Sequence, residues 1–343
     1  MEMMVCPMGS SRLFGTLAQT LSSAPLVQQD YYPEHQDPDQ DPEGLEQANP
    51  DQLLRECEEA LQNRPARPHR DLVYVADPTH QHQYRNHEQQ NTPPIREVDH
   101  YYDTFQPILA SLGYHSTFLS KPWSPCLDVA SNNGPDGCAL FYRRARFSLL
   151  STSHLRLSAM MLPTNQVAIV QTLRCQATGQ RLYVAVTHLK ARSGWERLRG
   201  AQGADLLQSL KAITSGPAGS DPVSRGAGGG NGTEGVPLIV CGDFNAEPSE
   251  DVYKRFISSP LGLGSAYKLL SADGQTEPAF TTWKIRPSGE SCSTLDYIWY
   301  SHGAFTVNTL LDIPTEEEIG PDRLPSYHYP SDHLSLLCDV SFR

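Results

Sequence analysis

Apolar and polar residues alternate in two distinct ways along the second two-thirds of the chain. Short apolar runs have the length of buried strands, at residues 138–142, 166–173, 182–186, 238–241, 305–310 and 334–340. Apolar residues that recur at a spacing near 3.6 predict helices over 103–112 and 195–213. Many strands with few helices predict an α/β domain in which two packed sheets are flanked by helices.

The first 94 residues lack this pattern. Residues 28–50 are rich in Asp, Glu, Gln and Pro, a composition typical of disordered chain. We therefore predict a largely disordered region over 1–65, with one short helix near 51–63 that stops at Pro65. A polar linker follows over 66–94, and the folded domain spans 95–343. Within the domain, the Gly- and Ser-rich stretch 215–235 predicts a flexible loop.

Composition narrows the class of protein further. The chain has 343 residues and a net charge of −12, which disfavours a general nucleic-acid binder. Eight cysteines form no CxxC pair, so a zinc site is not expected, and three in apolar runs (Cys138, Cys241, Cys338) are expected to be buried thiols. This usage predicts a reducing, cytoplasmic location. No apolar run reaches about 18 residues, so no membrane span is expected.

Four short polar signatures stand at the edges of the apolar runs. Asp243 and Asn245 directly follow one run, and His188 ends another. Asp296 and His333 lie in the later sequences Asp-Tyr and Ser-Asp-His. A carboxylate and a carboxamide at a strand end suit metal-assisted phosphate chemistry, although Gly-Asp-Phe-Asn alone also fits an ordinary turn.

In their order along the chain, from His188 to His333, the four signatures resemble those of the endonuclease/exonuclease/phosphatase superfamily. Longer blocks at 121–128, 133–140 and 187–197 are similar to its deadenylase-like branch. The resemblance covers residues 96–343 and implies a two-layer β-sandwich flanked by helices. A leader helix over 12–21 carries a single Arg, so a mitochondrial location is expected only for forms with a longer leader.

The resemblance also implies catalytic roles. His333 would lie beside the attacked phosphorus, with Asp296 behind it to hold the ring tautomer. Asp243 would orient the attacking water. Asn245 and His188 would hold the non-bridging oxygens, where negative charge grows during the reaction.

The metal ligand implied by the resemblance is Glu97, which would bind Mg²⁺ through oxygen. In the family, a strand carrying Trp-Asn and then a helix come before the strand that ends in this Glu. Such a unit needs about 30 residues or more, and none fits between Pro65 and Glu97. We therefore expect the domain to be N-terminally incomplete, lacking the first strand–helix–strand unit.

Four cations are candidate substrate-binding residues together with Asn245 and His333: Lys121, Lys190, Arg192 and Arg286. Lysine and arginine near a metal suit a ligand with several phosphates. The resemblance implies a Mg²⁺-dependent phosphohydrolase, acting as a monomer, that removes the 2′-phosphate of NADP(H) to give NAD(H).

Two alternatives stay open at this point. The first is a poly(A)-specific 3′-exoribonuclease, a deadenylase with RNA as its partner. Deadenylases carry an aromatic residue five positions before the Asp-Tyr motif, where adenine stacks, and this chain has Ser291 there. A lost stacking platform, worth about 1–3 kcal/mol per base, argues against that activity. The second alternative is a catalytically impaired form, because the missing unit would expose sheet edges.

Overall fold

The computed structural model describes residues 2–5, 101–128, 134–215, 236–326, 328–329 and 331–343. All of these belong to one unit of the chain. The short helix near 51–63, the polar linker, most of the loop 215–235 and Glu97 lie outside the described residues, as does the predicted disordered region after Val5. The prediction of disorder is wrong for Glu2–Val5, which form a strand because their backbone pairs with residues 336–339. Among the described helices, none is both long enough and apolar enough to cross a lipid bilayer.

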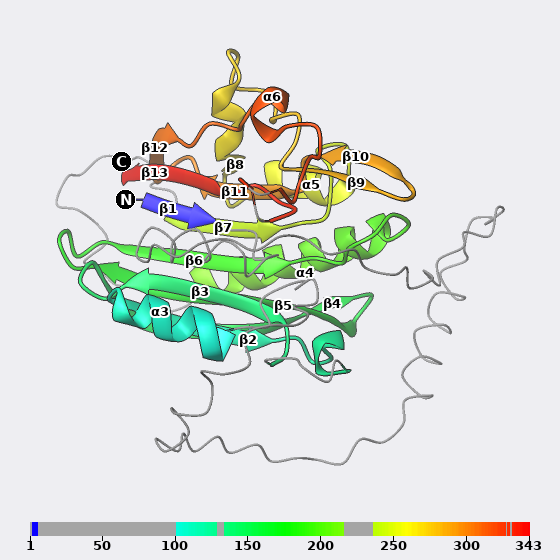
Figure 1. Ribbon diagram of the computed structural model, residues 1–343. Coiled ribbons are helices and arrows are strands. Elements are labelled where there is room, and N and C mark those ends of the chain that lie inside the picture. Colours follow the sequence, from blue (N-terminus) through cyan, green and yellow to red (C-terminus); the bar gives the residue numbers. More distant parts are fainter. Residues whose placement is uncertain (1, 6–100, 129–133, 216–235, 327, 330) are drawn as a thin grey trace, which may run out of the picture. The chain divides into compact units, whose positions relative to one another are not determined.

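The larger sheet has six strands (Figure 1). In spatial order they are β4 (Phe147–Ala159), β5 (Leu162–Cys175), β6 (Arg181–His188), β7 (Leu238–Asp243), β11 (Asp296–Ser301) and β8 (Leu263–Ser265). Only β6 and β7 pair in parallel, because the helix α4 (Glu196–Ser215) connects them as a crossover. The other neighbours are antiparallel.

The second layer is divided into two smaller sheets. One pairs β2 (Tyr114–Ser120) with β3 (Gly137–Arg143), and the other has the order β1 (Glu2–Val5), β13 (Leu336–Phe342), β12 (Phe305–Leu310). No strand of the described part of the chain joins the two. The absence of the first strand–helix–strand unit stays a prediction, because residues 6–100 are not among those described.

Two apolar cores explain how the layers hold together. The first lies between the sheets, where Ile239 and Ile298 of the larger sheet meet Leu140 and Leu336 of the second layer. The second lies on the opposite face of the larger sheet, where Val240 and Trp299 pack with helix residues. The predicted two-layer sandwich flanked by helices is thereby confirmed.

Helix α4 is close to α5 (Asp251–Ile257) because a glycine faces the second helix. A Cβ at Gly203 would overlap the side chain of Val252. The remaining helical elements are short. They are a π-helical turn at Tyr101–Phe105, α3 (Gln106–Ser111), 3₁₀ turns at Pro125–Asp128 and Ala266–Leu270, and α6 (Glu316–Ile319).

A separate hairpin stands beside the larger sheet, formed by β9 (Thr282–Arg286) and β10 (Gly289–Ser293) (Figure 1). Its outer residues are exposed to solvent. Arg323 holds it in place: the guanidinium lies 4.1 Å from the ring centroid of Trp283 and forms ion pairs with Glu290 and Glu316, each at 2.7 Å. Trp283 also packs against a small apolar cluster, so the base of the hairpin has a core while its outer half is exposed.

Candidate active site

Strand register brings three of the predicted residues into one row. His188 of β6 pairs with Asp243 of β7, and Asp243 pairs with Asp296 of β11. Neighbouring strands lie about 4.8 Å apart, so side chains in register on adjacent strands can touch. The sequence accounts for this row, because each residue is the first or last residue of a strand that is buried on both faces.

His333 joins this row from the loop before β13. Its Nδ1 lies 2.8 Å from Asp296 Oδ2, and its Nε2 lies 4.0 Å from Asp243 Oδ2. A backbone bridge to Thr282 fixes the loop. Asp296 is 1% exposed, and its Oδ2 also accepts a hydrogen bond from Thr281 Oγ1 at 2.6 Å. Asp296 therefore holds the proton on Nδ1 and directs Nε2 toward Asp243.

The two ionisable groups that face each other have shifted pKa values. Burial alone would lower the pKa of His333, but the carboxylates of Asp296 and Asp243 outweigh it and raise the pKa to about 9. Burial and the nearby Asp296 raise the pKa of Asp243 to about 7. Near neutral pH the site thus holds a cationic imidazole next to a carboxyl group that can accept a proton.

The pKa of His188 is shifted in the opposite direction to that of His333. Its Nε2 lies 3.6 Å from Asp243 Oδ2. Burial, followed by the positive charges of Lys121 and His333, lowers the pKa of His188 to about 3. Lys121 itself is buried and forms a 2.6 Å ion pair with Asp136. His188 is therefore a neutral hydrogen-bond donor, and direct contact of Lys121 with substrate stays a prediction.

The Gly-Asp-Phe-Asn turn owes its shape to local backbone constraints. Gly242 has φ of +148°, and a Cβ there would overlap the carbonyl oxygen of Thr187. Asn245 has φ of +49°; its N–H donates to Asp243 Oδ1 at 2.7 Å, and its Nδ2 donates to the carbonyl of Leu189 at 3.2 Å. The turn places the amide of Asn245 next to the carboxylate of Asp243.

Three predicted cations lie on segments next to the row. Lys190 and Arg192 belong to the loop that follows His188, and Lys190 Nζ lies 5.3 Å from the ring centroid of Trp195. Arg286 is exposed at the end of β9. Burial would raise the pKa of Asp332, beside His333, but the charges of His333 and Lys284, and to a lesser extent Arg286, lower it. The structure thus supplies positive charge near both histidines, while contact with substrate stays a prediction for each cation.

The sequence analysis missed two charged residues that contact segments of the candidate site. Arg199 of α4 is 2% exposed and donates to the carbonyls of Lys190 at 3.1 Å and Arg192 at 2.6 Å, while it binds Glu250 with two bonds of 2.9 Å. Lys284 of β9 lies 2.7 Å from Asp332 Oδ2. Strand alternation places Lys284 on the same face as Arg286, which was the available signal; Arg199 offered none.

Three of these side chains offer ligand atoms that all lie within 4.8 Å of one another: Asp243, Asp296 and His333. They do not make up a magnesium site by themselves. Mg²⁺ prefers oxygen ligands, His333 offers nitrogen, and Asp296 Oδ2 already accepts two hydrogen bonds. The implied ligand Glu97 lies outside the described residues.

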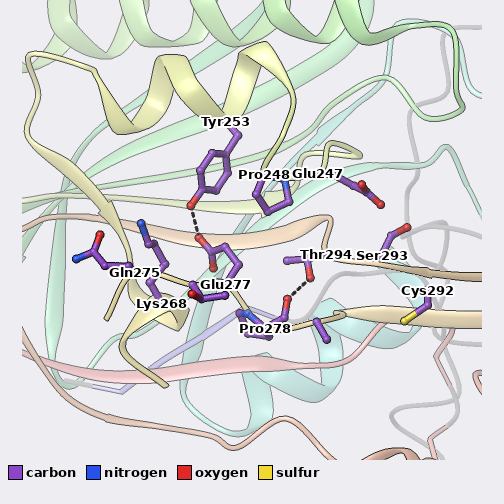
Figure 2. Close-up of a pocket in the computed structure, with 12 residues that line it drawn as sticks. Glu247, Pro248, Tyr253, Lys268, Gln275, Glu277, Pro278, Cys292, Ser293 and Thr294 are labelled. Atoms are coloured by element: carbon purple, nitrogen blue, oxygen red, sulfur yellow. Dashed lines mark hydrogen bonds between the residues drawn. The ribbon is translucent and has the colours of Figure 1, made fainter. Parts of the chain in front are cut away.

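A cavity of about 510 Å³ lies on another side of the Gly-Asp-Phe-Asn turn (Figure 2). Its lining includes Glu247, Lys268 and Glu277, and Figure 2 shows the Glu277 carboxylate pointing toward Tyr253, whose hydroxyl donates to it at 2.6 Å. None of the predicted site residues that the structure describes lines this cavity. The chemistry is therefore centred on the row of strand ends and not on this hollow.

A comparison with protein-family models matches residues 82–333 to the Endonuclease/Exonuclease/phosphatase family. The chain belongs to the endonuclease/exonuclease/phosphatase family. All five residues of the predicted catalytic set lie within the matched range. Members of this family are hydrolases that act as phosphatases or nucleases. This chain, as a member of the family, is a hydrolase.

Individual relatives narrow its place within the endonuclease/exonuclease/phosphatase family. Nocturnin of Xenopus laevis is 50% identical over 98% of this chain and 93% of that protein. The solved structure of the human Nocturnin catalytic domain with bound sulfate is 57% identical, with a TM-score of 0.60 over 72% of this chain and 79% of that one. The Ccr4 exoribonuclease subunit of Yarrowia lipolytica is 28% identical over 73% of this chain and 41% of that protein. The chain is a hydrolase of nocturnin type.

The alignment with the Xenopus relative has 382 positions, more than the 343 residues of this chain. At some aligned positions the chain therefore has no counterpart residue. The alignment length does not place these positions along the chain, so the absence of a segment of the family domain, and its identity as the first strand–helix–strand unit, stay predictions.

Proposed function

We propose that the chain removes the 2′-phosphate of NADP(H), releasing phosphate and NAD(H). The observation that carries the proposal is the His333–Asp243 pair, 4.0 Å apart, with Asp296 fixed behind His333. Both pKa values are raised, that of His333 to about 9 and that of Asp243 to about 7, so near neutral pH the pair holds a cationic imidazole next to a carboxyl group that can accept a proton. The 50% identity to a nocturnin supports a hydrolase of nocturnin type, and the family resemblance of the sequence implies NADP(H) as its substrate.

The residues suit one hydrolytic step. A water oxygen bonds to phosphorus while the bond from phosphorus to the ribose 2′-oxygen breaks, and that oxygen takes a proton from solvent water and leaves as a hydroxyl. Asp243 accepts the proton that the water loses. His333, His188 and the amide of Asn245 donate to the non-bridging oxygens, which gain negative charge. The cations Lys190, Arg192 and Arg286 hold the remaining phosphates of the dinucleotide.

We also propose a requirement for Mg²⁺, with Glu97 as a ligand. Divalent-metal dependence is typical of this family. A bound Mg²⁺ would neutralise charge on the phosphoryl oxygens. The neutral state of His188 fits such a site, since an additional cation would disfavour its protonation.

The decisive experiment measures phosphate release from NADP⁺ and NADPH by the purified full chain, with Mg²⁺ and then with EDTA. We expect metal-dependent release that is lost in His333→Ala and retained in His302→Ala, an exposed histidine outside the site. Absence of release from a folded, monodisperse sample would reject the proposal, and a chain that also leaves poly(A) intact would belong to the impaired class.

A second candidate function is 3′-exoribonuclease activity on poly(A), favoured by the similarity to Ccr4 subunits. Ser291 argues against it, because β10 offers an exposed, small side chain where adenine would need an aromatic ring. Shortening of a labelled poly(A) oligonucleotide, with no phosphate release from NADP(H), would favour this second function.

A further inference from the structure

A lysine that the predicted set does not include reaches the reactive nitrogen of His333. Lys284 Nζ lies 3.5 Å from His333 Nε2 and 2.7 Å from Asp332 Oδ2. Its side chain is 14% exposed. The bridge between Thr282 and His333, and the bond from Thr282 Oγ1 to the Asp332 carbonyl at 2.6 Å, fix β9 against this loop. Lys284 is therefore held at the reaction centre by its backbone.

The Nε2–H group of His333 and the ammonium group of Lys284 can donate hydrogen bonds but cannot accept them. The Nδ1 of His333 is committed to Asp296, and the nearby Asp243 also favours the cationic ring, so Nε2 carries a hydrogen. A lysine ammonium has three donors and no acceptor. Two donors 3.5 Å apart cannot bond to each other, but an anionic oxygen placed beside them accepts from both, in short charge-assisted hydrogen bonds.

We propose that Lys284 is a substrate-binding residue that, with His333, holds an oxygen of the phosphoryl group and gives the site its preference for phosphomonoesters over phosphodiesters. The inference rests on the proposed function and names its specificity residue. A monoester carries a charge of about −1.5 to −2 at neutral pH, whereas a diester carries one negative charge and one fewer terminal oxygen. An additional fixed cation at this position therefore stabilises the monoester more.

The test compares Lys284→Met and Lys284→Arg with Lys254→Met, a matched change at an exposed lysine of α5. We expect Lys284→Met to lower kcat/KM for NADP⁺ by about 10- to 100-fold, since a bond to a charged group is lost. Hydrolysis of the diester bis(4-nitrophenyl) phosphate should fall by less than about threefold. Lys284→Arg should recover part of the loss, and Lys254→Met should match wild type.

A second measurement is independent of turnover. Titration calorimetry with inorganic phosphate should show affinity about tenfold weaker in Lys284→Met, at an unchanged melting temperature. Equal losses on both esters, or unchanged phosphate affinity, would overturn the proposal and leave Lys284 with only the task of positioning Asp332. If wild type releases no phosphate from NADP⁺, the proposed function fails, and the phosphate titration still decides the role of Lys284.

Discussion

Asp243 illustrates how a buried strand end changes the chemistry of one residue. Its pKa in the folded chain, about 7, lies above the ordinary value of 3.8, because burial and Asp296 disfavour the charged form. The ionised carboxylate therefore costs folding free energy. That cost begins as the pH rises above 3.8 and is complete above 7.

We therefore predict that Asp243→Asn raises the melting temperature by several degrees at pH 8 and leaves it unchanged at pH 3, while hydrolysis is lost. Scanning calorimetry at the two pH values, with the exposed Asp322→Asn as the control, measures the difference. A variant with the same gain at both pH values would show that ionisation of Asp243 is not the cause.

His333 has the reverse effect on stability. Its pKa in the folded chain, about 9, exceeds the ordinary value of 6.5, because Asp296 and Asp243 stabilise the cation. The resulting stabilisation is complete below pH 6.5 and is lost as the pH rises through 9. We predict that His333→Gln lowers the melting temperature more at pH 6 than at pH 10. Thermal unfolding of this variant beside His302→Gln tests it, and a loss independent of pH would contradict it.

At the scale of elements, α4 connects the cationic loop to the rest of the domain. Arg199 binds two carbonyls of that loop and the carboxylate of Glu250 from a buried position. Removal of one partner of a buried ion pair leaves the other charge uncompensated, which typically costs about 3–5 kcal/mol. Arg199 thus contributes both to stability and to the position of Lys190 and Arg192.

We predict that Arg199→Met lowers the free energy of unfolding by about 3 kcal/mol and raises KM for NADP⁺ more than it lowers kcat. Denaturant unfolding and steady-state kinetics provide the two numbers. In the double variant with Glu250→Gln, stability should recover in part because no buried charge is left unpaired, but KM should stay high. Full recovery of both would show that the loop does not depend on Arg199.

The elements predicted from sequence are those with buried faces. The apolar runs correspond to β3, β5, β6, β7, β12 and β13, and the two helical patterns to α4 and to α3 with its preceding turn. β4 was missed because it is an edge strand whose first half is mostly exposed, so its apolar residues show no clear alternation. β9 and β10 were missed for the same reason.

The residues of the candidate site that were predicted, and those that were missed, differ for the same physical reason. His188, Asp243 and Asp296 were predicted because each ends or begins a buried strand, which makes a polar residue conspicuous. Arg199 and Lys284 were missed because, in a helix and in an exposed strand, a charged residue is normally a surface residue. Only the tertiary contacts with Glu250 and His333 distinguish them.

At the scale of the whole molecule, the divided second layer is the main departure from a continuous sandwich. The strand edges of its two sheets are not joined through any strand of the described residues. Insertion of the strand–helix–strand unit of a nocturnin relative should join them, and it should supply the strand carrying Trp-Asn that the family places before the Glu strand.

We predict that the extended chain melts at a higher temperature than the present one and releases phosphate from NADP(H) faster. Thermal unfolding and phosphate release, measured side by side on the two proteins, provide the comparison. Equal stability and equal turnover would show that the missing unit is dispensable.

The hairpin β9–β10 has a consequence for how the enzyme responds to heat. The row of strand ends is supported by apolar cores on both faces of the larger sheet. Lys284 lies near the base of the hairpin, which is fixed to the loop of His333, whereas Arg286 stands on its exposed outer half. In the proposed site, a bound substrate would contact the rigid strand ends on one side and the more flexible hairpin on the other. On warming, the outer half of the hairpin should loosen first. The affinity for phosphate should then weaken reversibly at temperatures where the strand ends and the global fold are still intact.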